Sequence, residues 1–233
     1  MFSILFVLSA CSGSGGGTAG GDTIKLGLIT PLTGDIASGG EMARNTTEDF
    51  VSANPTWAGK KVELFVEDGK CNPQEGASAA QKLVNVTKVD VLISMECSGA
   101  TLGALPIAEQ AKKLVVSAFS TSPKLSGASE YFYRVSPSDA NAGRVMAETV
   151  LADGHNKVAL LTENSDFATA YAEVFKKEFK GEIVVQENYN SGVNDFKTTL
   201  QKIKKSTASA IVHMNQTPAV IGFLAKQNVE LGL

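Results

Sequence analysis

The sequence lacks features that identify several common classes of protein. Its 233 residues carry a formal net charge of −3, so there is no basic excess of the kind that favours nucleic acid as a partner. Histidine occurs only at His155 and His213, and no two cysteines have the Cys-x-x-Cys spacing, which argues against a zinc site. We therefore expect neither nucleic-acid binding nor a bound metal or cofactor.

The signatures of common enzyme families are missing as well. There is no Gly-x-Ser-x-Gly turn, no Gly-x-x-x-x-Gly-Lys-Ser/Thr loop and no His-Glu-x-x-His motif. The loop at residues 31–40 comes nearest to a dinucleotide-binding turn, with Glu67 and Asp68 as groups that could contact a ribose. It lacks Gly-x-Gly-x-x-Gly, and the two acidic residues can more simply cap and solvate a turn. The sequence thus favours a binding protein over an enzyme.

The hydrophobic run at the N-terminus is short. Residues 2–8 are too few to span a bilayer, but they suit the core of a signal peptide. The Leu-Ser-Ala-Cys sequence that ends at Cys11 fits a bacterial lipobox, in which a lipid is attached to the cysteine sulfur. No Lys or Arg precedes the run, so a cytosolic start with a chance apolar patch stays open as the alternative. We expect a signal peptide at 1–10 and a lipid-anchored Gly/Ser linker at 11–23.

From residue 24 the sequence alternates between strand-like and helix-like segments. Strands are predicted at 24–30, 61–67, 89–94, 114–118, 131–135, 157–162, 182–187 and 208–213. Helices are predicted at 39–53, 73–86, 99–112, 140–152, 167–179, 195–205 and 218–231. This alternation indicates an α/β fold whose parallel sheets are covered by helices. Ligands in such folds bind beyond the carboxyl ends of the strands, so the loops that follow strands are the informative ones.

One of these loops has the geometry of a ligand cradle. A buried strand at 89–94 leads into small polar residues at 97–101 and then into apolar residues at helical spacing. The first N–H groups of a helix have no internal partner and favour an anion. Ser98 and Thr101 can add hydroxyl groups, and we expect the Ser98 hydroxyl at the surface of the turn. An ordinary capped helix is the alternative interpretation.

Five motifs that follow strands occur in one order along the chain. They are Gly-Leu-Ile-Thr-Pro-Leu-Thr-Gly at 27–34, Glu-Asp-Gly-Lys-Cys-Asn-Pro at 67–73, Cys-Ser-Gly-Ala-Thr at 97–101, Ser-Ala-Phe-Ser-Thr-Ser-Pro at 117–123 and Phe-Tyr-Arg-Val-Ser-Pro-Ser-Asp at 132–139. Together they resemble the type I periplasmic binding proteins, most closely the leucine/isoleucine/valine-binding branch that serves ABC importers. The resemblance covers nearly the whole chain from Ile24 onward.

The resemblance implies two Rossmann-like lobes that close over a ligand. The N-terminal α/β lobe is expected at 24–137 and a second α/β lobe at 138–233, with the crossover near Ser136 and Asp139. The family continues well beyond the position that corresponds to Leu233. We therefore expect the second lobe to be incomplete and the sequence to be truncated at its C-terminus.

The resemblance also assigns ligand-binding residues in the N-terminal lobe. Ser98 matches a serine that binds the α-carboxylate of an amino acid, and Gly99 and Ala100 offer N–H groups beside it. Thr121 matches a threonine near the α-ammonium and carboxylate groups, and the backbone at Phe119 also contributes. Each of these residues could instead be an ordinary loop or core residue.

Three further candidates lie in the second lobe. Phe167 matches a position that is usually a tyrosine and closes over the ligand, so a hydroxyl group is missing here. Asn215 and Gln216 follow a strand where the family often has an aromatic residue. The acidic partner of the ammonium group usually lies beyond Leu233 in the family.

The cysteines divide into two roles. With Cys11 assigned to the lipid, Cys71 and Cys97 remain as a pair, and an exported chain permits a disulfide between them.

The expected function is that of an extracytoplasmic solute-binding lipoprotein of an ABC importer. It would bind a branched-chain-like amino acid or a similar small polar solute and dock on the membrane subunits of a permease. The lipid anchor would hold it at the membrane, in the periplasm or on the surface of a bacterial cell. The alternative is a ligand-sensing domain of the same fold, and an enzyme ranks third.

The lipobox leads to a first prediction. When the gene is expressed in a bacterium with an intact signal, we expect the protein to partition with the membrane fraction, and Cys11→Ala should release it into the soluble fraction. Fractionation and detection of the lipid by mass spectrometry would check this. A wild-type protein that is unlipidated and soluble would remove the anchor.

Overall fold

The computed structural model describes residues 22–94 and 97–233. The predicted signal peptide, Cys11 and nearly all of the predicted linker lie outside the described residues. Within the described part of the chain, no helix has both the length and the apolar character needed to cross a membrane.

The first sheet has six strands in the order β2-β3-β1-β4-β5-β6. All neighbouring strands are parallel except β2, which runs antiparallel to β3. The strands are β1 (Thr23–Thr30), β2 (Thr56–Trp57), β3 (Lys60–Asp68), β4 (Val91–Ser94), β5 (Leu114–Ser117) and β6 (Phe132–Arg134). The helices are α1 (Ala37–Ala53), α2 (Pro73–Gln81) continued by a π-helical segment η1 (Lys82–Thr87), α3 (Ser98–Gln110) and a short 3₁₀ turn η2 (Pro123–Leu125). The expected parallel α/β architecture is therefore confirmed.

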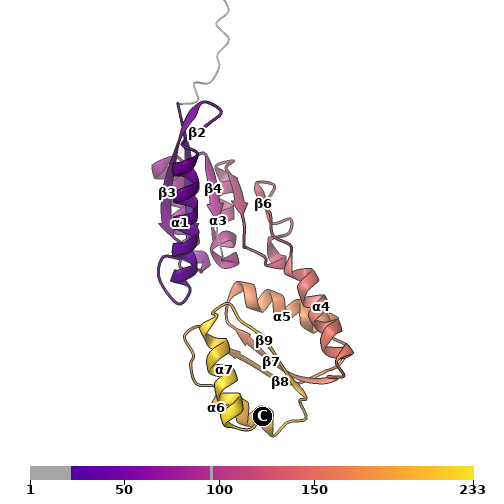
Figure 1. Cartoon of the computed structure of the whole chain (residues 1–233). Coiled ribbons are helices and arrows are strands. Elements are labelled where there is room, and N and C mark those ends of the chain that lie inside the picture. Colours follow the sequence, from indigo (N-terminus) through magenta and orange to yellow (C-terminus); the bar gives the residue numbers. More distant parts are fainter. Residues whose placement is uncertain (1–21, 95–96) are drawn as a thin grey trace, which may run out of the picture.

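A second sheet has three parallel strands in the order β8-β7-β9. The elements are α4 (Asp139–Ala152), β7 (Lys157–Glu163), α5 (Asp166–Glu178), β8 (Glu182–Tyr189), α6 (Lys197–Lys204), β9 (Ala210–Met214) and α7 (Ala219–Glu230). Figure 1 shows the two sheets in separate bodies, with α4 leading from one to the other. We call the part up to residue 137 the first lobe and the rest the second lobe. The division of the chain into two domains at this residue stays a prediction.

The central strand β7 shows why the second sheet is covered on both faces. Val158 and Leu160 pack into one apolar cluster with residues of α4 and α5, whereas Ala159 and Leu161 pack into another with residues of α6 and α7. All four side chains are fully buried. Because successive side chains of a strand point to opposite faces, a continuous apolar run predicts a strand between two helical layers.

Two glycines let α2 and α3 approach each other backbone to backbone. A side-chain carbon on Gly76 would lie 2.2 Å from the carbonyl oxygen of Ala100, and one on Gly103 would lie 2.0 Å from that of Pro73. Any larger residue at either position would force the helices apart. The start of α3 is thereby held against the start of α2.

A disulfide between Cys71 and Cys97 joins the same two helix starts, as the sequence predicts. The two Cα atoms are 5.0 Å apart, and 26 positions separate the residues in sequence. Cys97 immediately precedes α3, and Cys71 lies in the turn between β3 and α2. The disulfide therefore fixes the loops at the carboxyl ends of β3 and β4.

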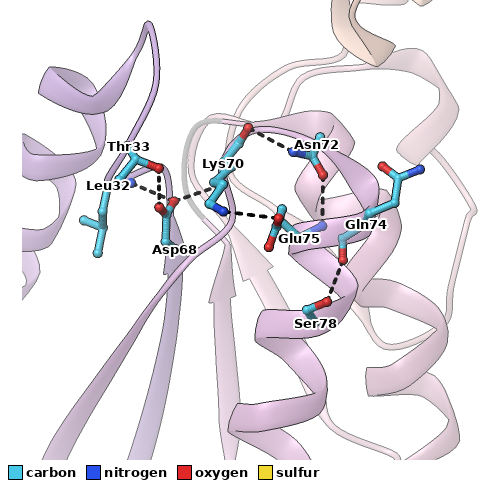
Figure 2. Close-up of polar contacts among 8 residues, drawn as sticks. All are labelled: Leu32, Thr33, Asp68, Lys70, Asn72, Gln74, Glu75 and Ser78. Atoms are coloured by element: carbon cyan, nitrogen blue, oxygen red, sulfur yellow. Dashed lines mark hydrogen bonds and ion pairs between the residues drawn. The ribbon is translucent and has the colours of Figure 1, made fainter.

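Asp68, the last residue of β3, holds the loop that follows the neighbouring strand β1 (Figure 2). Its Oδ1 atom accepts hydrogen bonds from the N–H groups of Leu32 and Lys70, each at 2.9 Å, and its Oδ2 atom accepts one from the Thr33 hydroxyl at 2.6 Å. The turn beyond it is held separately, since the Asn72 side chain caps α2 by accepting from the Glu75 N–H at 2.9 Å. The simpler expectation for Asp68, a role in holding a turn, fits these contacts.

Sequence and structure differ mainly at short or irregular elements. The two-residue strand β2 was not predicted, because two residues carry no periodicity. The predicted helix at 73–86 is divided into α2 and the π-helical η1, which ends at Thr87 and is followed by Lys88 in the left-handed conformation with φ 60°. The strand predicted at 89–94 begins at Val91.

The disulfide should contribute to thermal stability. In the chain-entropy model, closing this loop stabilises the fold by roughly 3.5 kcal/mol, which in a chain of this size corresponds to a melting temperature higher by about 7–14 °C. We expect the double variant Cys71→Ala/Cys97→Ala to melt lower by that amount in calorimetry. Wild-type protein in reductant should match the variant, and an unchanged melting temperature in both would contradict the prediction.

Asp68 should make stability depend on pH. Burial raises the pKa of this carboxyl group, but the hydrogen bonds from Thr33, Leu32 and Lys70 outweigh burial and leave the pKa below its ordinary value. A carboxylate of this kind stabilises the fold above the pKa of the unfolded chain, about 3.9, and the contribution is lost as pH falls through the lower pKa of the folded state.

We therefore expect Asp68→Asn to lower the free energy of unfolding by about 1 kcal/mol at pH 7 and to have a smaller effect near pH 3. Urea denaturation at the two pH values measures both differences. The matched control is Asp49→Asn, which changes an exposed aspartate on α1. An equal loss of stability at both pH values would show that the carboxylate charge is not involved.

Candidate functional site

A cavity of about 600 Å³ lies where the loops of the two lobes face each other. The first lobe contributes the loop after β1, the start of α1 and the loop after β5, while the second contributes the start of α5 and the loop between β9 and α7. The lining residues are Asp35, Ile36, Ser38, Gly39, Met42, Phe119, Thr121, Phe167, Asn215, Gln216, Pro218 and Ala219. Five of the eight residues expected to bind a ligand are among them: Phe119, Thr121, Phe167, Asn215 and Gln216.

A smaller and more polar cavity of about 450 Å³ adjoins the first. It extends toward the disulfide, and Cys71, Asn72 and Pro73 form its wall in the first lobe. Charged groups from both lobes line it, including Lys70, Glu163 and Asp166. Asp35, Ile36 and Gln216 border both cavities, so the two spaces are parts of one cleft.

The three other expected residues lie at the start of α3 and are buried. The side chain of Ser98 is 1% exposed, so the expectation of a hydroxyl at the surface of the turn is wrong. Its Oγ atom accepts a hydrogen bond from the Ser122 N–H at 3.1 Å, which ties α3 to the loop after β5. None of these three residues is among the described residues that line the two cavities.

A carboxylate of the second lobe lies beside Gly99, in the first turn of α3. The Oδ2 atom of Asp166 lies 3.1 Å from the position that a side-chain carbon on Gly99 would take. The Oδ1 atom of Asp166 is 4.0 Å from the ammonium group of Lys124. An anion is favourable at the start of a helix, because the first N–H groups have no internal acceptor. The carboxylate of Asp166 therefore lies beside the first turn of α3, close to where such an anion would bind.

Thr101, the other hydroxyl considered for the ligand, is used inside the first lobe. Its Oγ1 atom lies 2.7 Å from the hydroxyls of Ser94 and Ser120, and it donates to the carbonyl of Cys97 at 3.0 Å. All of these side chains are buried. The network fastens α3 to β4 and to the loop after β5, so Thr101 has a structural role.

Arg134 of β6 holds the loop after β5, and this loop contributes Phe119 and Thr121 to the lining of the larger cavity. The guanidinium group of Arg134 donates to the carbonyls of Ser120 at 3.3 Å and Ser122 at 2.9 Å. Thr121 lies between these two anchored residues, and Phe119 precedes them with 59% of its surface exposed. The fold therefore places the Phe119 ring and the Thr121 side chain on the lining of the larger cavity.

Glu163 shapes the opposite wall and was not singled out from the sequence. This residue ends β7, is 2% exposed, and accepts hydrogen bonds from the N–H groups of Gln216 at 2.7 Å and Thr217 at 2.9 Å. The Thr217 hydroxyl also donates to it at 2.7 Å. The carboxylate thus fixes the loop after β9 that carries Asn215 and Gln216. Its position after the apolar run of β7 is the only sequence signal that pointed to it.

Tyr189 and His213 join the outer strands of the second sheet near this carboxylate. The Tyr189 hydroxyl lies 2.6 Å from Nε2 of His213. Burial lowers the pKa of His213 and the charge of Glu163 opposes that effect, while burial and the same charge raise the pKa of Tyr189. Both side chains are therefore neutral near pH 7, and the pair serves to cross-link β8 and β9.

Phe167 lies one residue into α5 and faces the larger cavity. Its ring packs at 54° against Tyr171 with 6.1 Å between the ring centroids. The Ser165 hydroxyl caps this helix by accepting from the Ala168 N–H at 3.1 Å, which fixes the turn from which Phe167 projects. Within residues 22–94 and 97–233, no three His, Cys, Asp or Glu side chains gather as a metal site would require.

Several known proteins are similar to this chain in sequence and in fold. The "Leucine-, isoleucine-, valine-, threonine-, and alanine-binding protein" of Pseudomonas aeruginosa is 26% identical over 98% of this chain and 63% of its own length. A leucine-binding protein from Thermotoga maritima superposes with a TM-score of 0.82 at 27% identity, over 90% of this chain and 61% of that structure. A solute-binding protein of an ABC transporter from Rhodopseudomonas palustris, solved with 3,4-dihydroxybenzoic acid, gives 0.79 at 28% identity, over 90% and 60%.

The chain spans about 60% of the length of these relatives. The family model described as "Periplasmic binding protein" matches residues 23–233, which is nearly all of the chain that the structure describes. This match agrees with the resemblance found in the motifs that follow strands, and with the expectation of a binding protein rather than an enzyme. The chain belongs to the periplasmic binding protein family.

Proposed function

We propose that this protein is the solute-binding component of an ABC importer and that it holds its solute in the cleft between the two lobes. The observation that carries the proposal is the larger cavity, which draws its lining from both lobes. A ligand that touches both lobes stabilises the closed arrangement, since it makes all of its contacts only there.

The chemistry of the cavity favours a small solute with an apolar body and a polar end. Ile36, Met42, Phe119 and Phe167 supply apolar surface, and the polar groups of Thr121, Asn215 and Gln216 lie on the same lining. A branched-chain amino acid fits this description, and one similar structure, from Streptococcus pneumoniae, contains isoleucine. The two phenylalanine rings also suit an aromatic acid, which makes a hydroxybenzoate the second candidate.

The site for the solute's carboxylate at the start of α3 remains part of the proposal. Ser98 accepts a hydrogen bond from Ser122, and its own hydroxyl proton is still available as a donor. The N–H groups of Gly99 and Ala100 are the neighbouring donors. The carboxylate of Asp166 lies beside Gly99, so a solute carboxylate bound there would lie close to it and to its partner Lys124.

Membrane attachment and partners belong to the same proposal. A lipid on Cys11 would keep the protein at the membrane, in the periplasm or on the cell surface, where it would deliver solute to permease subunits. A permease gene beside this one would support transport. A transmembrane segment encoded in the same gene would instead support the alternative of a sensor domain.

Binding measurements on the product of the complete gene test the proposal. We expect isothermal titration calorimetry to show binding of leucine, isoleucine or valine, or else of 4-hydroxybenzoate. The matching amide, leucinamide or 4-hydroxybenzamide, should bind at least tenfold more weakly if a carboxylate is recognised, because a hydrogen bond to a charged group contributes about 1.5–3 kcal/mol. Absence of binding for all of these acids would contradict the proposed solute class.

Variants of Phe167 then locate the site. Phe167→Ala should weaken binding of the acid found in that screen by about 10- to 50-fold, because the ring's apolar surface is lost from the cavity. Phe167→Tyr keeps the ring and is the matched control, with an expected change of less than about threefold. If Phe167→Ala binds as tightly as wild type, the solute does not lie in the larger cavity.

A further inference from the structure

The lining of the larger cavity carries charge of one sign. Of the described residues that line it, Asp35 is the only one with a charged side chain, and no lysine or arginine is among them. Asp35 lies in the loop after β1, two residues before α1, and it is exposed. A solute in this cavity therefore meets a carboxylate and no cationic side chain on the same lining.

The carboxylate of Asp35 can accept further hydrogen bonds. Among the described residues its only donor is the Ser191 hydroxyl, which reaches Oδ2. A carboxylate has about four acceptor positions. No ion pair within the described part of the chain includes Asp35. Its Oδ1 atom and its charge are therefore available to a solute.

The uncharged polar groups on the same lining also suit a donor. The amide nitrogen of Asn215 donates to the carbonyl of Thr217 at 3.0 Å, which leaves the Oδ1 atom of Asn215 as an acceptor. Gln216 and Thr121 add an amide and a hydroxyl, and the oxygen of each can accept. An ammonium group donates through all of its N–H bonds and cannot accept. These oxygens and the carboxylate of Asp35 are therefore complementary to an ammonium group.

The smaller cavity adds to the excess of carboxylates. Glu163 and Asp166 line it together with Asp35, and Lys70 is the one lysine or arginine among the described residues of its lining. The ammonium group of Lys70 lies 3.2 Å from the carboxylate of Glu75, which balances its charge. A solute of net negative charge, such as a hydroxybenzoate, would enter a cleft in which like charges repel it.

We propose that Asp35 is a specificity-determining residue that binds an ammonium group of the solute, and that the cleft therefore selects an amino acid over an aromatic acid. This inference rests on the proposed function and deepens it, because it decides between the two solute classes named there. A hydrogen bond from an ammonium group to a carboxylate is charge-assisted and stronger than a neutral one. The resemblance places the acidic partner of the ammonium group beyond Leu233, whereas Asp35 belongs to the first lobe.

Calorimetry on the product of the complete gene tests this with matched pairs of probes. Leucine, isoleucine and valine are each compared with the same acid without its ammonium group, which for leucine is 4-methylpentanoate. We expect the wild type to bind the tightest of the three amino acids about tenfold or more tightly than its partner acid. Asp35→Asn should weaken binding of that amino acid about tenfold. It should leave the partner acid unchanged or bound more tightly, because that acid makes no charged contact with Asp35.

Two further variants separate the charge of Asp35 from its contact with Ser191. Ser191→Ala removes the hydroxyl donor and keeps the carboxylate, so the preference for the amino acid should remain. Asp49→Asn removes an exposed carboxylate of α1 that is not on the lining of either cavity, and it should change neither affinity. Circular dichroism should show the same secondary structure for all variants.

Three results would overturn the inference while leaving a solute in the cleft. Asp35→Asn could bind the amino acid as tightly as wild type does, it could lose affinity equally for the amino acid and its partner acid, or the wild type could bind 4-hydroxybenzoate and none of the amino acids. Absence of binding for all of these acids would instead contradict the proposed solute class, and this inference with it.

Discussion

The cleft depends on one kind of interaction, in which a carboxylate at the end of a strand holds the loop after the neighbouring strand. In the first lobe Asp68 ends β3 and accepts from the N–H of Leu32 and the hydroxyl of Thr33, in the loop after β1. In the second lobe Glu163 ends β7 and accepts from the N–H groups of Gln216 and Thr217, in the loop after β9. A parallel sheet makes this possible because the carboxyl ends of its strands meet at one edge.

The sequence predicted the elements well because their signals are local. The apolar run of β7 and the alternation of strands with helices are visible along the chain, and so is the turn that precedes α3 at Ser98. The candidate site was harder to predict, because whether a side chain faces the cleft or bonds inside the lobe depends on residues that are distant in sequence. Thr101 could have faced a ligand, but its hydroxyl is hydrogen-bonded to that of Ser120, 19 positions later. Glu163 was not singled out, because the N–H groups that it accepts from lie 53 and 54 positions away, in the loop after β9.

The start of α3 brings these points together. The sequence identified it as a place for an anion, and the carboxylate of Asp166 from the second lobe lies beside Gly99 there. Two carboxylates cannot share that place without a proton or a cation between them, because like charges in close contact repel strongly. A solute carboxylate at Ser98 and Gly99 is therefore favoured when the Lys124 ammonium group balances the charge of Asp166, or when Asp166 lies farther from Gly99. A solute that stays among Phe119, Thr121 and Phe167 leaves Asp166 where it is, so the position of this one side chain separates the two modes of binding.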